Sequence, residues 1–327
     1  MQPGSDRKSS TAQILKASAI IGGSSAFSIV SGIVKSKVMA VLLGPEGIGL
    51  LGLLQSVLNT AGTVSGMGLA ASGVRQIAEA KASGDTDALA HTRMALWWSA
   101  LITGALGALL LITLRQPIAR LVTGAEGYAG ALAWLAAGVW ATTVSGAQIA
   151  ILNGLRYLGH LARVYILGAL GGMLIAVLAV WQWREAGIAV AVVSTPLVLL
   201  VVSWYYTHRI AKIRVRATWQ TLSKPLRRLF SLGFAFMITN LIRTGAQFAV
   251  RVLLTATLGV TSTGHFQAAW SISALYLGFV LESMGKDFYP RLTAVANDRE
   301  TTNALVNDQA ELALLLAAPV ILSMLTL

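Results

Sequence analysis

Four basic side chains fall inside long apolar segments of the sequence, where a charge is costly. They are Lys35, Lys37, Arg243 and Arg251. A charged side chain near the centre of a bilayer costs about 2.5 to 3.5 kcal/mol even on lenient insertion scales, so such residues usually serve a function. Guanidinium and ammonium groups bind phosphate, and arginine can do so through two parallel hydrogen bonds. These residue types therefore predict a binding site for an amphiphile with a phosphate head.

Spacing places most of these cations on two polar helix faces. Residues at steps of three and four share one face of a helix. One such stripe consists of Asn240, Arg243, Gln247 and Arg251. A second stripe, in the first apolar segment, consists of Ser24, Ser28, Ser31 and Lys35. Two such faces opposite each other would line a hydrated cleft, and because Lys37 lies off the second stripe, this geometry favours Lys35 as the cavity-facing residue.

Each basic residue also has a purely structural interpretation. Arg243 lies about 16 residues before Gly259, hence about 24 Å from that helix end, so it either binds an anion or pairs with an acid such as Glu282. Arg251 and Lys37 lie within about 12 Å of the outer helix ends, where long side chains can reach water.

Amide side chains are the other candidate ligands, because they can hydrogen-bond sugar hydroxyls. We expect this role for Asn240, Gln247, Gln55 and Gln267. A single amide in a membrane helix, such as Gln148, is more often part of an interhelical hydrogen bond. Gly62-x-x-x-Gly66 and Gly168-x-x-x-Gly172 likewise indicate close helix packing.

Enzyme and metal-site signatures are missing from the sequence. It contains no cysteine, and its four histidines have no metal-ligand spacing. It has no phosphate-binding glycine loop of the nucleotide-hydrolysing type and no nucleophile elbow. We therefore expect no catalytic residue, no metal and no cofactor.

Composition identifies the elements that must position these residues. Of 327 residues, 55% are hydrophobic and only 12% are charged, against about 25% charged in an ordinary soluble domain. Several apolar runs exceed about 18 residues, the length of a membrane span. The chain is therefore predicted to be an all-α, polytopic membrane protein, which excludes a soluble enzyme.

Charge distribution predicts the orientation. The net charge is +12, but the basic residues sit mostly in loops, which favours contact with anionic membrane lipids over nucleic acid. With a cytoplasmic N-terminus, the outer segments contain only Arg115, Arg120 and Arg184 as basic residues. The positive-inside rule therefore places the N-terminus in the cytoplasm.

Nine spans are predicted along the chain. They cover residues 14–43, 48–72, 94–114, 128–152, 164–181, 187–206, 229–258, 264–284 and 312 onward. The turn Gly44-Pro45-Glu46-Gly47 separates the first two, since glycine and proline interrupt helices. Polar loops are expected over 75–93 and 290–308. The last span is short, so we expect a fragment or a chain that lacks its last helices.

An internal repeat organises these spans. A shift of 215 residues places Gly44 on Gly259, Gly49 on Gly264, and the first two spans on the seventh and eighth. Repeated halves are common in secondary transporters, with the substrate site between them. The predicted parts are a cytoplasmic tail, a six-helix lobe, a basic cytoplasmic linker and a partial second lobe of about three helices. They cover residues 1–13, 14–207, 208–228 and 229–327.

Three segments resemble a known transporter family. They are Lys37-Val-Met-Ala-Val-Leu-Leu-Gly-Pro-Glu-Gly-Ile-Gly-Leu50, the stretch from Gln55 to Glu79 with Gly66-Met-Gly68 and Arg75-Gln-Ile-Ala-Glu79, and Leu152-Asn-Gly-Leu155. They are similar to Wzx-type O-antigen flippases of the MOP (multidrug/oligosaccharidyl-lipid/polysaccharide) superfamily. The resemblance implies two six-helix lobes around a cationic cavity. It also makes Lys37 the expected basic residue of the first helix, so Lys35 and Lys37 both stay candidates.

The resemblance also implies a substrate and a location. The cargo would be undecaprenyl-pyrophosphate-linked oligosaccharide, moved by alternating access across the bacterial inner membrane for O-antigen or other surface polysaccharide. Anionic lipids, a polysaccharide polymerase and a chain-length regulator are the other candidate partners. The alternatives are a lipid II flippase, a multidrug exporter, which would need intramembrane acids, and a non-transporting scaffold for polysaccharide assembly.

Overall fold

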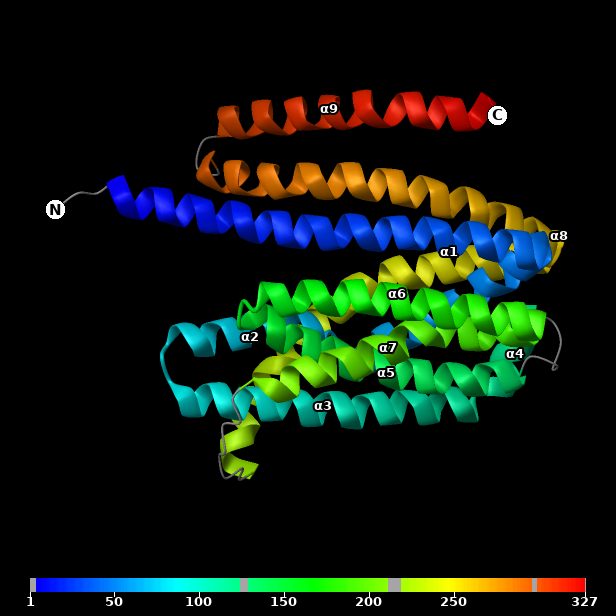
Figure 1. The fold of residues 1–327 in the computed structure, drawn as a ribbon, viewed down its shortest axis with the longest axis horizontal. Coiled ribbons are helices and arrows are strands. Elements are labelled where there is room, and N and C mark those ends of the chain that lie inside the picture. Colours follow the sequence, from blue (N-terminus) through cyan, green and yellow to red (C-terminus); the bar gives the residue numbers. More distant parts are fainter. Residues whose placement is uncertain (1–3, 124–128, 211–218, 296–298, 327) are drawn as a thin grey trace. The chain divides into compact units, whose positions relative to one another are not determined.

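The computed structural model describes residues 4–123, 129–210, 219–295 and 299–326, and every element within them is helical (Figure 1). The elements are α1 (Gly4–Gly66), α2 (Leu69–Ala82), α3 (Thr86–Thr113), α4 (Arg115–Thr123), α5 (Ala129–Gly154), α6 (Leu158–Trp183), the short 3-10 turn η2 (Arg184–Gly187), α7 (Ile188–Arg209), α8 (Trp219–Val295) and α9 (Arg299–Thr326). The all-α prediction is confirmed.

Five stretches of the described chain are long and apolar enough to cross a membrane. They are Gly22–Gly66, Thr86–Thr113, Gly130–Gly154, Leu158–Arg209 and Thr221–Ser271. Three of them contain a break, at Gly44, at η2 and at Gly259. A stretch that breaks in its middle can fold back and cross twice, so two single and three double stretches give the first eight predicted crossings.

Gly44 and Gly259 interrupt α1 and α8 in the same way. Gly44 has φ 66° and ψ −174°, and Gly259 has φ 83° and ψ 170°. Such positive φ values are readily adopted only by glycine. The two breaks lie 215 residues apart, as the repeat predicts, and each separates two spans expected from the sequence.

The predicted polar loops are largely helical. Residues 75–93 belong mostly to α2 and α3, and only 83–85 separate these helices. Helix α2 is amphipathic: it buries Leu69, Gly73 and Ile77, whereas Arg75 and Glu79 form an exposed ion pair at 2.8 Å. Asp85 caps α3 by accepting hydrogen bonds from the backbone N–H groups of residues 87 and 88. Its charged face made α2 read as a loop.

Other boundaries differ for the same reason. Helix α4 occupies residues expected to be an outer loop, and α8 and α9 extend into 290–308 as far as Val295 and from Arg299. The predicted linker 208–228 also becomes helical from Trp219 onward, while 211–218 lie outside the described residues. Hydropathy marks the apolar middle of a helix, so it underestimates helices with polar ends.

A layered apolar core joins α1, α5 and α7. Its largest buried members are Leu53, Leu54 and Leu58 of α1, Leu132, Leu135 and Val139 of α5, and Ile188 and Val192 of α7. Helix α3 packs on α5, α5 on α7 and α7 on α6 (Figure 1). Gly168 and Gly172 permit the last contact, because an added Cβ would meet Leu199 and Thr195 of α7. The packing interpretation of this glycine pair is confirmed.

The first half of α8 runs antiparallel to the second half of α1. The two helices meet at three levels: Gly264 beside Gly49, Thr244 beside Thr60, and Gly233 beside Gly68 just after α1 ends. Thr60 Oγ1 donates a hydrogen bond to the Thr244 carbonyl at 3.4 Å. This part of α8 therefore packs along α1 for most of the height of the helix pair.

The contact at Gly49 and Gly264 has the symmetry of the repeat. A Cβ at Gly49 would meet the carbonyl of Val260 and the backbone nitrogen of Gly264, and a Cβ at Gly264 would meet the carbonyl of Pro45 and the nitrogen of Gly49. A shift of 215 residues exchanges Pro45 with Val260 and Gly49 with Gly264. The contact is therefore self-complementary, as at a two-fold axis.

Cα packing divides the chain into two compact units, Met1–Gly264 and His265–Leu327. The contacts above all lie within the first unit. The second unit comprises the remainder of α8 and α9. The predicted boundary between lobes near residue 207 stays a prediction.

Candidate functional site

The polar stripe of α8 passes from exposed to buried along the helix. Asn240 and Arg243 are exposed and Gln247 is half-buried, whereas Arg251 is only 5% exposed. The Asn240 amide donates to the Phe236 carbonyl at 3.2 Å, and Arg251 Nη1 donates to the Gln247 carbonyl at 3.0 Å. Arg251 therefore does not reach water from the surface of this unit, whereas Arg243 presents its guanidinium to the surroundings.

The facing half of α1 brings amide groups to the same level. Gln55 Nε2 donates to Asn59 Oδ1 at 3.1 Å, and Asn59 is exposed. Because Thr60 meets Thr244 and the helices are antiparallel, a rise of 1.5 Å per residue places Gln55 and Asn59 level with the segment from residue 244 to about 250. The structure thus brings Gln55 close to the stripe that carries Arg243 and Gln247.

Lys35 and Lys37 point in different directions. Lys35 Nζ is half-buried and donates to the Ala191 carbonyl at 3.4 Å and to Thr195 Oγ1 at 3.5 Å, both on α7. Lys37 is exposed. The stripe argument expected Lys35 to face a cleft opposite α8, but its ammonium group lies against a helix of its own lobe. Helical spacing identifies residues that share a face, but not the neighbour that the face meets.

Two predicted residues lie in the second unit. Gln267 donates from Nε2 to Ser271 Oγ at 3.1 Å, one turn along the same helix. The side chain of Glu282, the candidate acid partner of Arg243, lies outside the described residues. Since Arg243 is exposed within its own unit, a buried ion pair does not account for it there.

The arrangement can bind an anion and polyhydroxylated groups, but it offers no acid–base pair. Among the described residues, the ion pair that the structure contains joins Arg75 and Glu79 at one helix end. The same residues include no group of three or more histidine, aspartate or glutamate side chains able to hold a metal ion. An exposed guanidinium suits a phosphate oxygen, and neighbouring amides suit hydroxyl groups.

Gln148 has the structural role expected of a single amide. Its Oε1 accepts a hydrogen bond from the Ser203 hydroxyl and so links α5 to α7. Both side chains are buried. This bond is the interhelical type predicted from the sequence.

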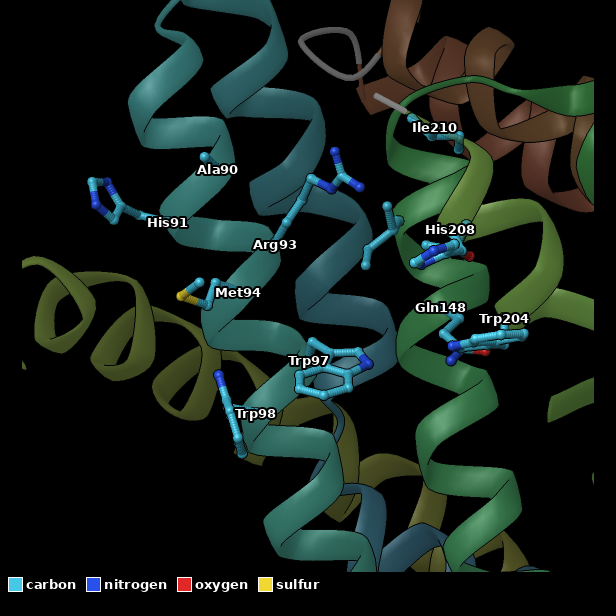
Figure 2. A pocket seen from close by; sticks show the side chains of 12 residues that line it. Ala90, His91, Arg93, Met94, Trp97, Trp98, Gln148, Trp204, His208 and Ile210 are labelled. Atoms are coloured by element: carbon cyan, nitrogen blue, oxygen red, sulfur yellow. The ribbon is translucent and has the colours of Figure 1, made fainter. Parts of the chain in front are cut away.

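A cavity of about 470 Å³, which we call the α3/α5/α7 cavity, lies apart from the predicted binding residues (Figure 2). It is lined by Ala90, His91, Arg93, Met94, Trp97 and Trp98 of α3, Gln148 and Ile151 of α5, Trp204, Thr207 and His208 of α7, and Ile210. Figure 2 shows Arg93 and Trp97 projecting from α3 toward Gln148, Trp204 and His208. Sequence reasoning missed this cavity, because its residues come from three separate segments without a shared motif.

Comparisons with known proteins agree on one protein type. A family model described as "Polysaccharide biosynthesis protein" matches residues 38–327. The lipid III flippases of Escherichia coli (strain K12) and Shigella flexneri are each 23% identical over 302 residues, which cover 90% of this chain and 70% of theirs.

Solved structures of transporters superpose on the chain. A multidrug resistance MATE family transporter of the MOP superfamily, in an inward-facing conformation, gives a TM-score of 0.70 at 18% identity, over 92% of this chain and 68% of that one. A MOP superfamily transporter from Pyrococcus furiosus gives 0.64 at 18% identity, over 94% and 69%. An outward-facing MATE structure gives 0.63 at 18% identity, over 94% and 69%. At this identity the superpositions establish the fold alone.

Proposed function

The chain belongs to the polysaccharide biosynthesis protein family and has the fold of MOP superfamily transporters, and from this premise we propose that it is a flippase for a lipid-linked oligosaccharide. Two relatives named lipid III flippase support a lipid-linked saccharide as cargo. We extend the proposal to undecaprenyl-pyrophosphate-linked oligosaccharide of the O-antigen or surface polysaccharide type. The chain would move this cargo by alternating access, without catalysis.

The exposed guanidinium of Arg243 carries this proposal. It lies on the polar stripe of α8 beside the amide pair of α1, and a diphosphate is the part of such a cargo that a guanidinium recognises. We assign phosphate contact to the four intramembrane cations, Lys35, Lys37, Arg243 and Arg251. We assign contact with sugar hydroxyls to the four amide residues, Asn240, Gln247, Gln55 and Gln267.

The setting of the proposal follows from the charges and the family. We place the chain in the bacterial inner membrane with its N-terminus in the cytoplasm, because basic residues concentrate in segments on that side. A polysaccharide polymerase and a chain-length regulator are the proposed protein partners. Anionic membrane lipids surround the basic helix ends.

Replacing Arg243 tests the proposal directly. Arg243→Ala should abolish surface polysaccharide in a strain that depends on this chain, while the protein stays in the membrane at normal level. Arg227→Ala is the matched control, because Arg227 is an exposed arginine of the same helix near its beginning. Arg243→Lys should keep part of the activity, since a point charge still attracts phosphate without bidentate bonding. Normal polysaccharide with Arg243→Ala would reject the site.

A scaffold role predicts a different result in vesicles. The purified chain is reconstituted with fluorescent lipid-linked oligosaccharide, and a quencher reports which leaflet holds the label. Exchange between leaflets that Arg243→Ala removes supports transport. No exchange, with retained binding to a polymerase or glycosyltransferase, would favour the scaffold.

A further inference from the structure

The α3/α5/α7 cavity is a second candidate binding site. Its lining residues lie at the ends of α3 and α7 that also carry Lys81 and Arg209, so it opens at the basic end of the helices. None of the eight residues assigned to the oligosaccharide lines it. Its occupant is therefore independent of the transport proposal.

The lining combines one permanent cation with large aromatic side chains. Arg93 is half-buried, and Trp97, Trp98 and Trp204 are 37%, 49% and 54% exposed. Tryptophan concentrates where membrane helices meet the lipid headgroups, because its ring is apolar and its N–H is polar. Arg93 therefore lies at headgroup depth, with aromatic surface beside it that can contact acyl chains.

Further polar groups line the same space. His91 and His208 contribute imidazole rings, and the ring of His208 stacks on Trp204 with centroids 5.4 Å apart. The Nε2 atom of His91 is buried and has no hydrogen-bond partner among the described residues. A buried polar atom without a partner is costly unless a bound molecule or water satisfies it. The lining thus offers both a charge and an unsatisfied polar atom to a ligand.

We propose that the α3/α5/α7 cavity binds the headgroup of an anionic phospholipid. The phosphate accepts hydrogen bonds from the Arg93 guanidinium, and the acyl chains leave across the exposed faces of Trp97 and Trp204. Basic pockets between membrane helices bind acidic lipid headgroups by this combination of charge and apolar surface. A free phosphate ion fits less well, because most of the lining is apolar and would leave its other oxygens without donors.

Native mass spectrometry of the full chain in detergent tests the proposal with three probes. These are phosphatidylglycerol, phosphatidylcholine and glycerol 1-phosphate, which carries the headgroup chemistry without acyl chains. The wild type should prefer phosphatidylglycerol, and Arg93→Gln should weaken that binding about tenfold, as loss of a charge-assisted hydrogen bond predicts. Arg163→Gln is the control, because Arg163 is exposed near the same helix ends and lies outside the cavity.

A second variant separates binding from folding. Thr207→Trp places bulk into the cavity and leaves Arg93 intact, so it should also remove the preference for phosphatidylglycerol. Equal binding of phosphatidylglycerol by the wild type, Arg93→Gln and Thr207→Trp would overturn the proposal. Equally tight binding of glycerol 1-phosphate would overturn the lipid assignment in favour of a soluble anion.

Discussion

The self-complementary contact between Gly49 and Gly264 predicts how alanine is tolerated there. An alanine Cβ at either position would fall on backbone atoms of the other helix, including the Gly264 nitrogen at 2.9 Å from a Cβ at Gly49. Backbone atoms cannot rotate away as a side chain does, so the helices must move apart. Overpacking of this kind costs about 1 to 3 kcal/mol.

The symmetry of the contact adds a quantitative expectation. Once Gly49→Ala has separated the helices, a second methyl group at Gly264 meets less obstruction. The double variant should therefore lose less stability than the sum of the two single variants, by about 1 kcal/mol, as expected for residues in direct contact. Independent sites would instead give additive losses.

Thermal unfolding in detergent is a suitable assay, with fixed scan rate and detergent. A loss of 1 to 3 kcal/mol should lower Tm by about 2 to 6 °C in a chain of this size. Gly245→Ala is the matched control, because Gly245 lies on the same helix and an added Cβ meets nothing within 4 Å. That control should be neutral or stabilising, since alanine favours a helix over glycine. If Gly49→Ala and Gly264→Ala behave like Gly245→Ala, the reasoning fails.

Two other predictions address the helix pair and its break. Since the chain has no cysteine, Thr60→Cys with Thr244→Cys should form a disulfide under mild oxidation, seen as a mobility shift on gels, whereas Thr60→Cys with Thr239→Cys should not; the reverse order of efficiency would contradict the antiparallel register. Gly44→Ala should lower Tm although its Cβ meets open space, because a positive φ costs alanine about 1 to 2 kcal/mol, and an unchanged Tm relative to Gly245→Ala would contradict the break at Gly44.

The breaks and the repeat were predictable because glycine leaves a local signature. Gly44 and Gly259 are followed at the same spacing by Gly49 and Gly264, and the structure gives both breaks a positive φ. The contact between Gly49 and Gly264 was not predictable, because a repeat predicts equivalent positions and not which of them touch. It becomes visible only when the two helices are placed side by side.

The candidate site was predictable in composition but only partly in geometry. Spacing correctly placed Asn240, Arg243 and Gln247 on one helix face, yet it could not show that Arg251 is buried. It also could not show that Lys35 reaches α7, since that depends on tertiary packing. The direction of a polar stripe requires knowledge of its neighbours.

The two glycine breaks are alike in backbone but differ in bracing. The hydroxyls of Thr255 and Thr263 lie 2.9 Å apart and form a hydrogen bond across the break at Gly259. The repeat places Ala40 and Ile48 at the matching positions around Gly44, and these side chains cannot form such a bond. A neutral hydrogen bond contributes about 1 kcal/mol, so α1 bends or straightens at lower cost than α8. Any rocking motion in this unit would therefore start from its amino-terminal elbow.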